Sequence, residues 1–127
     1  MNVTIILVIL FIHWVADFVF QTDKMAQGKS KNWGDLLRHT ATYSFVFYVI
    51  LPFYALYMGD KYVMWTGTQF VVITFIAHTL QDYFTSRLNS RLWEKKEVHY
   101  FFVSIGFDQF LHFAQLILTY HFLFNYS

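Results

Sequence analysis

Three pairs of histidine and aspartate, each spaced by four residues, lie within segments that are otherwise apolar. The pairs are His13 with Asp17, His78 with Asp82, and Asp108 with His112. Residues four apart lie on one face of a helix, so each pair can point into a shared interior. Imidazole and carboxylate together suit zinc, iron or manganese, whereas magnesium and calcium prefer sites made of oxygen alone. The pattern predicts a polar centre that holds a divalent metal, with zinc favoured as the cofactor over iron or manganese.

The composition indicates that the helices around this centre lie in a membrane. Of 127 residues, 57% are hydrophobic and only 13% are charged, which is too apolar for an ordinary soluble domain. A net charge of +1 argues against a nucleic-acid partner, which a basic stripe would indicate. The absence of cysteine excludes disulfides, thiolate ligands and a cysteine nucleophile. We therefore expect the lipid bilayer as partner and no nucleic acid.

Four apolar segments can be traced along the chain. They cover residues 3–21, 35–58, 62–88 and 100–124. A helix needs roughly 20 mostly apolar residues to cross about 30 Å of hydrocarbon, and each segment reaches or approaches that length. The predicted fold is all-α: one transmembrane domain over residues 1–127, built as an antiparallel four-helix bundle. Pro52 is expected to kink the second helix.

The basic residues predict an orientation. Eight of the nine flank the first and third connections: Lys24, Lys29, Lys31, Arg38, Arg87, Arg91, Lys95 and Lys96. Because positive charge is retained on the inner side of a membrane, both termini should face outward and both basic connections should face the cytoplasm. The expected localisation is the bacterial inner membrane. In this orientation the three pairs, and His39 from the second segment, fall between the bilayer middle and the cytoplasmic face.

Energetics make these residues candidates for function. An aspartate at the centre of a membrane helix costs roughly 2.5 to 3.5 kcal/mol, so three of them need partners, protons or a cation. The candidate metal ligands are His13, Asp17, His39, His78, Asp82, Asp108 and His112. The three aspartates, Asp17, Asp82 and Asp108, are also the catalytic candidates.

Six further residues are candidates for orienting a ligand or holding a substrate. They are Gln21, Lys24, Arg38, Tyr43, Arg87 and Gln109. Glutamine and tyrosine can hydrogen-bond to a histidine and hold its ring in place. Lysine and arginine on the same side of the membrane could hold a phosphate or an anionic lipid.

Four strings resemble the small membrane proteins of the bacterial and phage domain-of-unknown-function family 3307. They are HWVADFVFQTDKMA from His13, HTATY from His39, HTLQD from His78 and DQFLH from Asp108. The most specific parts are D-F-x-x-Q-T-D and D-Q-x-x-H, and the resemblance covers almost the whole chain. It implies a helical integral membrane protein with motif positions at His13, Asp17, Gln21, His39, His78, Asp82, Asp108, Gln109 and His112. The family has no established activity, so the resemblance leaves the chemistry open.

The leading hypothesis is a metal-dependent hydrolase acting on a lipid-like or phosphate-bearing substrate. The metal would lower the pKa of water, an aspartate outside the ligand set would act as base, and Arg38, Arg87 or Lys24 would hold the substrate. One alternative is a channel or transporter for protons, metal ions or other small ions, in which several protomers of a homo-oligomer would form the pore. Another is a small protein that docks on a larger membrane complex. A single pair also has a structural interpretation, as a hydrogen bond between helices.

Overall fold

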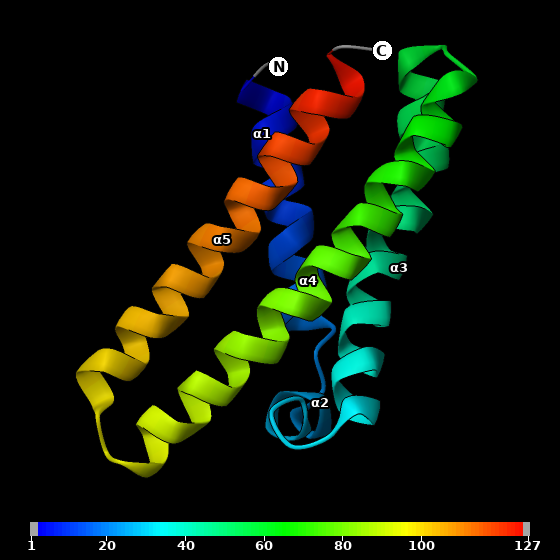
Figure 1. Cartoon of the computed structure of the whole chain (residues 1–127). Coiled ribbons are helices and arrows are strands. Elements are labelled where there is room, and N and C mark those ends of the chain that lie inside the picture. The colour runs from blue at the N-terminus through cyan, green and yellow to red at the C-terminus, as the bar shows by residue number, and fades with distance from the viewer. Residues whose placement is uncertain (1–2, 126–127) are drawn as a thin grey trace.

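The computed structural model describes residues 3–125, and these form an all-α bundle whose four main helices pack antiparallel (Figure 1). In chain order the elements are α1 (Val3–Trp14), the π-helical turn η1 (Val15–Val19), α2 (Asp23–Gly28), α3 (Trp33–Met58), α4 (Tyr62–Glu94) and α5 (Val98–Phe124). α4 packs along both α3 and α5, whereas α1 makes fewer contacts with its neighbours. The predicted fold class, an antiparallel all-α four-helix bundle, is confirmed.

The two ends of the bundle differ in charge. Figure 1 shows the start of α1, the end of α5 and the α3–α4 connection at one end, with α2 and the α4–α5 connection at the other. Eight of the nine Lys and Arg residues belong to the segments around α2 and the α4–α5 connection, and Lys61 lies in the α3–α4 connection. We call the end with α2 and the α4–α5 connection the basic end, and the opposite end the far end.

Three helices, α3, α4 and α5, are long and apolar enough to cross a membrane, and Val3–Val19 is a shorter apolar helix. Large apolar side chains on their outer faces are exposed, as Leu56, Phe45 and Phe110 illustrate. Apolar surface this extensive is stable against lipid and unfavourable in water. The length and the exposed faces of these helices suggest an integral membrane protein.

Several helix boundaries differ by a few residues from those predicted. α3 begins two residues early because Asn32 caps it: Asn32 Oδ1 accepts from the Asp35 backbone N–H at 2.8 Å, and Asn32 Nδ2 donates to Asp35 Oδ2 at 2.8 Å. α4 continues six residues beyond the predicted end, to Glu94. α3 also continues through Pro52 to Met58. The first connection contains α2, which Thr22 caps by accepting from the Met25 backbone N–H.

Gly28 allows α2 to pack directly on the start of α3. A β-carbon at this position would overlap the Asp35 carboxylate, which is buried and already bonded to Asn32. We therefore expect Gly28→Ala to displace α2 and to lower the free energy of unfolding by roughly 1–3 kcal/mol, the usual range for overpacking. Thermal melting of the purified protein in detergent measures the loss.

Gly106 in α5 provides the matched control, because a β-carbon there would meet no atom within 4 Å. Gly106→Ala should leave the melting temperature unchanged or raise it, since alanine favours a helix interior over glycine by about 1 kcal/mol. Equal melting temperatures for Gly28→Ala and the wild type would contradict the close packing of α2.

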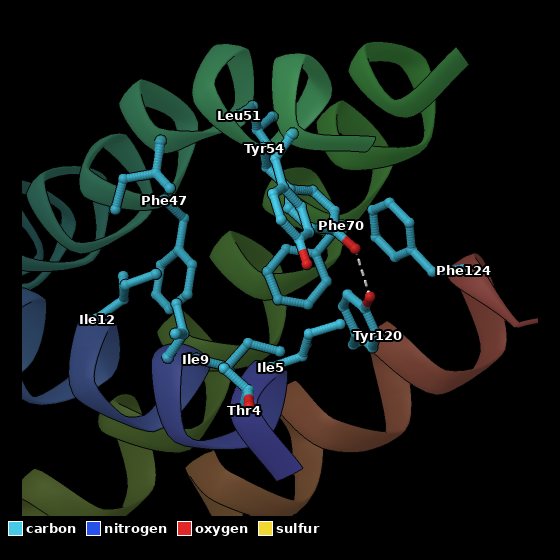
Figure 2. A pocket seen from close by; sticks show the side chains of 13 residues that line it. Thr4, Ile5, Ile9, Ile12, Phe47, Leu51, Tyr54, Phe70, Tyr120 and Phe124 are labelled. Carbon is cyan, nitrogen blue, oxygen red and sulfur yellow. Dashed lines mark hydrogen bonds between the residues drawn. The ribbon is translucent and has the colours of Figure 1, made fainter. Parts of the chain in front are cut away.

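The far half of the bundle is apolar. Figure 2 shows a pocket of about 400 Å³ there, between α1, α3, α4 and α5, with Ile9, Phe47 and Phe70 among its lining side chains. The Tyr54 and Tyr120 hydroxyls are hydrogen-bonded to each other across it. Among the residues that the structure describes, no histidine, carboxylate, lysine or arginine lines this pocket. The buried histidines and carboxylates therefore lie elsewhere in the bundle.

Candidate metal centre

All four main helices bring histidine or aspartate into one buried cluster. Its members are His13 and Asp17 from α1 and η1, His39 from α3, His78 and Asp82 from α4, and Asp108 and His112 from α5. Each of the seven residues is less than 10% exposed. Within each pair spaced by four, imidazole nitrogen and carboxylate oxygen lie 3.3 to 3.7 Å apart. The helical spacing and the burial together concentrate the polar groups at one place in the bundle.

Four of these residues form what we call the four-residue group: Asp17, His39, His78 and Asp82. His39 Nε2 is the central atom, at 3.0 Å from Asp17 Oδ1, 3.1 Å from Asp82 Oδ2 and 3.2 Å from His78 Nε2. His78 Nε2 lies 3.5 Å from Asp17 Oδ1 and 3.7 Å from Asp82 Oδ2. Ligand atoms on a tetrahedral zinc ion with bonds of about 2.1 Å are about 3.4 Å apart. Five measured separations therefore match the edges of such a tetrahedron.

A carboxylate oxygen in this group is unsatisfied. Asp17 Oδ1 is buried and accepts no hydrogen bond from the described residues, although His39 Nε2 and His78 Nε2 are close to it. A buried carboxylate oxygen without a donor is costly, and a cation bound between these atoms would remove that cost. The donor set therefore fits a divalent ion with nitrogen and oxygen ligands.

A second set, the three-residue group, consists of Asp82, Asp108 and His112. His112 Nε2 lies 3.1 Å from Asp82 Oδ1 and 3.3 Å from Asp108 Oδ1. Asp82 thus contributes to both groups, through Oδ2 to one and Oδ1 to the other. By ligand type alone, each group could hold a metal.

The protons on His78 and His112 distinguish the two groups. His78 Nδ1 and His112 Nδ1 are 3.2 Å apart, so one must donate and the other must accept. If His78 Nε2 binds a metal, its neutral ring carries the proton on Nδ1, and His112 Nδ1 accepts it. His112 must then carry its own proton on Nε2, where it donates to Asp82. A metal in the four-residue group therefore makes His112 a hydrogen-bond donor that orients a ligand.

A chain of hydrogen bonds holds two of the aspartates from the other side. Gln109 Oε1 can only accept, so His13 Nε2, at 2.8 Å, donates to it, and His13 Nδ1 accepts from the Tyr43 hydroxyl at 2.7 Å. Gln109 Nε2 donates to Asp17 Oδ2 at 3.2 Å and to Asp108 Oδ2 at 3.3 Å. This chain turns the Oδ1 atoms of both aspartates toward the cluster. Because both ring nitrogens of His13 are engaged, His13 lies outside both metal-ligand groups.

Tyr43 also fixes the ring of His78. The two rings stack at a centroid distance of 3.8 Å and an interplanar angle of 8°, and Tyr43 is fully buried. Stacking restricts rotation of the His78 ring and keeps Nε2 directed at His39. One tyrosine thereby orients two histidines, through its ring and through its hydroxyl.

Lys29, one of the eight basic residues used above to predict the orientation, reaches the cluster. Its Nζ donates to Asp82 Oδ2 at 2.9 Å, and its side chain is 19% exposed. Burial lowers the pKa of the Lys29 ammonium, but the carboxylates of Asp82 and Asp17 raise it more, so the pKa lies above its usual value. Lys29 is therefore charged at neutral pH. Two residues in the sequence relate to this position, Thr22 and Gly28. Thr22 caps α2, and Gly28 lets α2 pack closely against the bundle.

Asp17 lies in the π-helical turn. Phe20 N–H bonds to Val15 O, five residues back, in place of the usual four. The wider turn shifts side-chain directions locally, and single π turns occur often at functional sites. Here the turn positions a carboxylate that approaches both His39 and His78.

A cleft of about 560 Å³ leads to the cluster at the basic end, between η1, α2, α4 and α5. We call it the polar cleft. Asp17, Asp108, Gln109 and Lys29 line it on the cluster side, and Gln21 also lines it. The cleft therefore reaches the carboxylates of Asp17 and Asp108.

The three cations predicted to hold a substrate lie outside the lining of the polar cleft. Arg38 is exposed and lies 3.7 Å from Asp35. Arg87 donates to the Tyr83 backbone carbonyl and stacks over the Tyr83 ring. Lys24 is exposed on α2. Lys29 is the cation that the structure brings to the site instead.

Comparison with known proteins gives one family match. No curated protein and no solved structure matches the chain. The family described as "Protein of unknown function (DUF3307)" matches residues 5–127, which include all seven residues of the buried cluster. The match extends over nearly the whole bundle, so the chain belongs to the DUF3307 family.

Proposed function

We propose that this protein is a metal-dependent membrane hydrolase whose single divalent ion, preferably zinc, is held by the four-residue group. The observation that carries the proposal is the set of five separations of 3.0 to 3.7 Å between imidazole and carboxylate atoms of Asp17, His39, His78 and Asp82. These atoms come from three different helices, so local helix geometry alone does not explain their convergence.

Charge balance supports one ion and not two. One divalent cation together with the Lys29 ammonium balances the carboxylates of Asp17, Asp82 and Asp108. A buried site without net charge has the lowest cost in a membrane interior. If His78 binds the ion, His112 carries its proton on Nε2. This nitrogen then cannot bind a second ion in the three-residue group, which agrees with a single ion.

A bound ion would lower the pKa of a water molecule toward neutrality. Asp108 lies outside the four-residue group, and its Oδ1 accepts no hydrogen bond from the described part of the chain. Gln109 holds the other oxygen of this carboxylate, and Asp108 lines the polar cleft. Asp108 is thus the candidate base that takes a proton from water during hydrolysis of a lipid-like or phosphate-bearing substrate.

The apolar far half favours a closed site over an ion path. Ion paths through a membrane are usually marked by polar or ionisable side chains. The pocket in the far half is lined by side chains such as Ile9, Phe47 and Phe70, and no histidine, carboxylate or basic group among the described residues lines it. The polar cleft, in contrast, is lined by residues of α2, such as Gln27, and of the last part of α4, such as Trp93, which lie toward the basic end. Because positive charge favours the inner side, we place that end in the cytoplasm of a bacterial cell.

Elemental analysis after purification in metal-replete buffer tests the proposal. We expect one ion per chain in the wild type and none in His39→Ala, which removes the central ligand of the group. His112→Ala should keep its ion at saturating metal, with affinity lower by about 10- to 100-fold, the usual effect of losing a residue that orients a ligand.

His121→Ala is the matched control, since His121 lies near the end of α5, away from the cluster. It should bind one ion with wild-type affinity. Absence of metal in the wild type would overturn the proposal. Two ions per chain would overturn the proton assignment of His112.

A further inference from the structure

The polar cleft contains side-chain atoms that the metal centre leaves unused. Gln21 Oε1, Ser86 Oγ and Asn89 Oδ1 all belong to residues lining the cleft, and each is buried without a hydrogen-bond partner in the described range 3–125. Ser86 is 6% exposed. Buried polar atoms are rarely left unpaired, so an unpaired set in one cleft points to a ligand.

Two of these residues form a line from the metal centre toward the basic end. Asp82, Ser86 and Asn89 lie on α4 at positions separated by four and three residues, so they share one helix face. At about 1.5 Å per residue, Ser86 lies about 6 Å and Asn89 about 10 Å beyond Asp82 along the helix. The distance from Asp82 to Asn89 is therefore long enough for a small polar group whose other end lies at the metal centre.

The chemistry of the unused atoms selects the ligand. Amide oxygens accept hydrogen bonds, and a serine hydroxyl both accepts and donates. The three residues are neutral, and the Lys29 ammonium in the cleft is engaged by Asp82. Neutral acceptors suit hydroxyl groups, whereas an ammonium would favour carboxylates and an isolated anion would favour free cations.

Aromatic side chains connect the cleft with the outer surface of the bundle. Phe18, Trp93 and Phe102 line it and are exposed. In an apolar helical bundle such side chains face lipid, so a lipid can enter the cleft head first and leave its acyl chains outside.

We propose that the polar cleft binds the hydroxyl-bearing headgroup of a membrane phospholipid, with its phosphate toward the metal centre. The inference rests on the proposed function, because it names the substrate class of the same site. Gln21 and Asn89 accept hydrogen bonds from the headgroup hydroxyls and Ser86 donates to one of them, and the selectivity of the site resides in these three contacts.

Competitive lipid binding tests the inference. The metal-loaded protein is equilibrated with equal amounts of phosphatidylglycerol, phosphatidylethanolamine and phosphatidylcholine of identical acyl chains, and retained lipid is identified by native mass spectrometry. Phosphatidylglycerol, which carries hydroxyls, should be retained preferentially. Ser86→Ala and Asn89→Leu should each reduce that preference about five-fold, the effect of one lost neutral hydrogen bond.

Ser44→Ala is the matched control. Ser44 is 5% exposed and its hydroxyl is equally unpartnered within the described residues, but it lies on α3 and does not line the cleft. It should keep the wild-type preference. Equal retention of phosphatidylcholine, which has no hydroxyl or amine donor, would overturn the inference, as would preference for phosphatidylethanolamine or an equal effect of Ser44→Ala.

Metal content measured on the same samples separates the two proposals. A metal-loaded protein without headgroup preference contradicts the headgroup inference alone. A protein that prefers phosphatidylglycerol but binds no metal contradicts the proposed hydrolase and leaves the headgroup site standing.

Discussion

Replacing Asp82 with asparagine should abolish metal binding and destabilise the metal-free protein. The Asp82 carboxylate lies within 3.1 Å of His39 Nε2, His112 Nε2 and Lys29 Nζ, which come from three separate segments. Asparagine keeps the shape but loses the charge, so the ion loses an anionic ligand and the Lys29 ammonium loses its counterion. Leaving one partner of a buried ion pair uncompensated costs roughly 3–5 kcal/mol.

Two measurements check this prediction. Elemental analysis should show one ion per chain in the wild type and none in Asp82→Asn, and the melting temperature of the metal-free variant should fall by several degrees. Asp23→Asn, an exposed position on α2, should change neither quantity. Retention of a full ion by Asp82→Asn would exclude the four-residue group as the binding site.

Replacing Lys29 with methionine should lower the stability of the metal-free protein and raise its affinity for the metal. Without the ammonium, the Asp82 charge is uncompensated in the metal-free protein, and stability should fall by roughly 3–5 kcal/mol. The divalent ion, however, no longer meets a positive charge bonded to one of its ligands. Its affinity should rise by about ten-fold or more, since a coupling of about 1.4 kcal/mol already gives that factor.

Chelator competition and thermal melting with and without metal measure these effects. Lys31→Met, which removes an exposed charge from the same connection, should have little effect on either. The Asp82→Asn, Lys29→Met double variant should regain the stability lost by each single variant and still bind no metal, because it removes both charges together. Weaker metal binding by Lys29→Met would mean that Lys29 does not oppose the ion.

The helical part of the site could be predicted because it depends on spacing alone. His78 and Asp82 are four residues apart on α4, and Asp108 and His112 are four apart on α5, so each pair meets within one helix. Burial of the pairs followed from placing polar residues in apolar segments, since lipid cannot satisfy them. The fold class followed from the lengths of the same segments.

Hydrogen-bond partners across helices could not be predicted in the same way. His13 shares the spacing of the other pairs, yet its ring nitrogens bond to Tyr43 on α3 and Gln109 on α5. These partners lie 30 and 96 residues away in the chain. The partner of each ring nitrogen depends on how the helices are rotated and how deep they lie relative to one another. The spacing of residues within one helix gives no information about either.

The placement of the cations shows the same limit. The sequence predicts eight basic residues at one end of the bundle, but it does not distinguish which of them reaches the site. α2 turns Lys29 toward Asp82, whereas Arg38 lies near Asp35 at the exposed start of α3. A short helix held by one cap and one glycine contact decides which cation enters the site.

The sequence by itself determined the helical class, the apolar spans and the one-sided pairs, because hydropathy and the helical repeat act within a single segment. Only the tertiary structure decided that Asp17, His39, His78 and Asp82 converge, that His13 supports them through Gln109, and that Lys29 neutralises Asp82. The physical reason is that a metal-ligand set is defined by distances of 3 to 4 Å between atoms of different helices. Such distances depend on how the helices rotate and pack against one another.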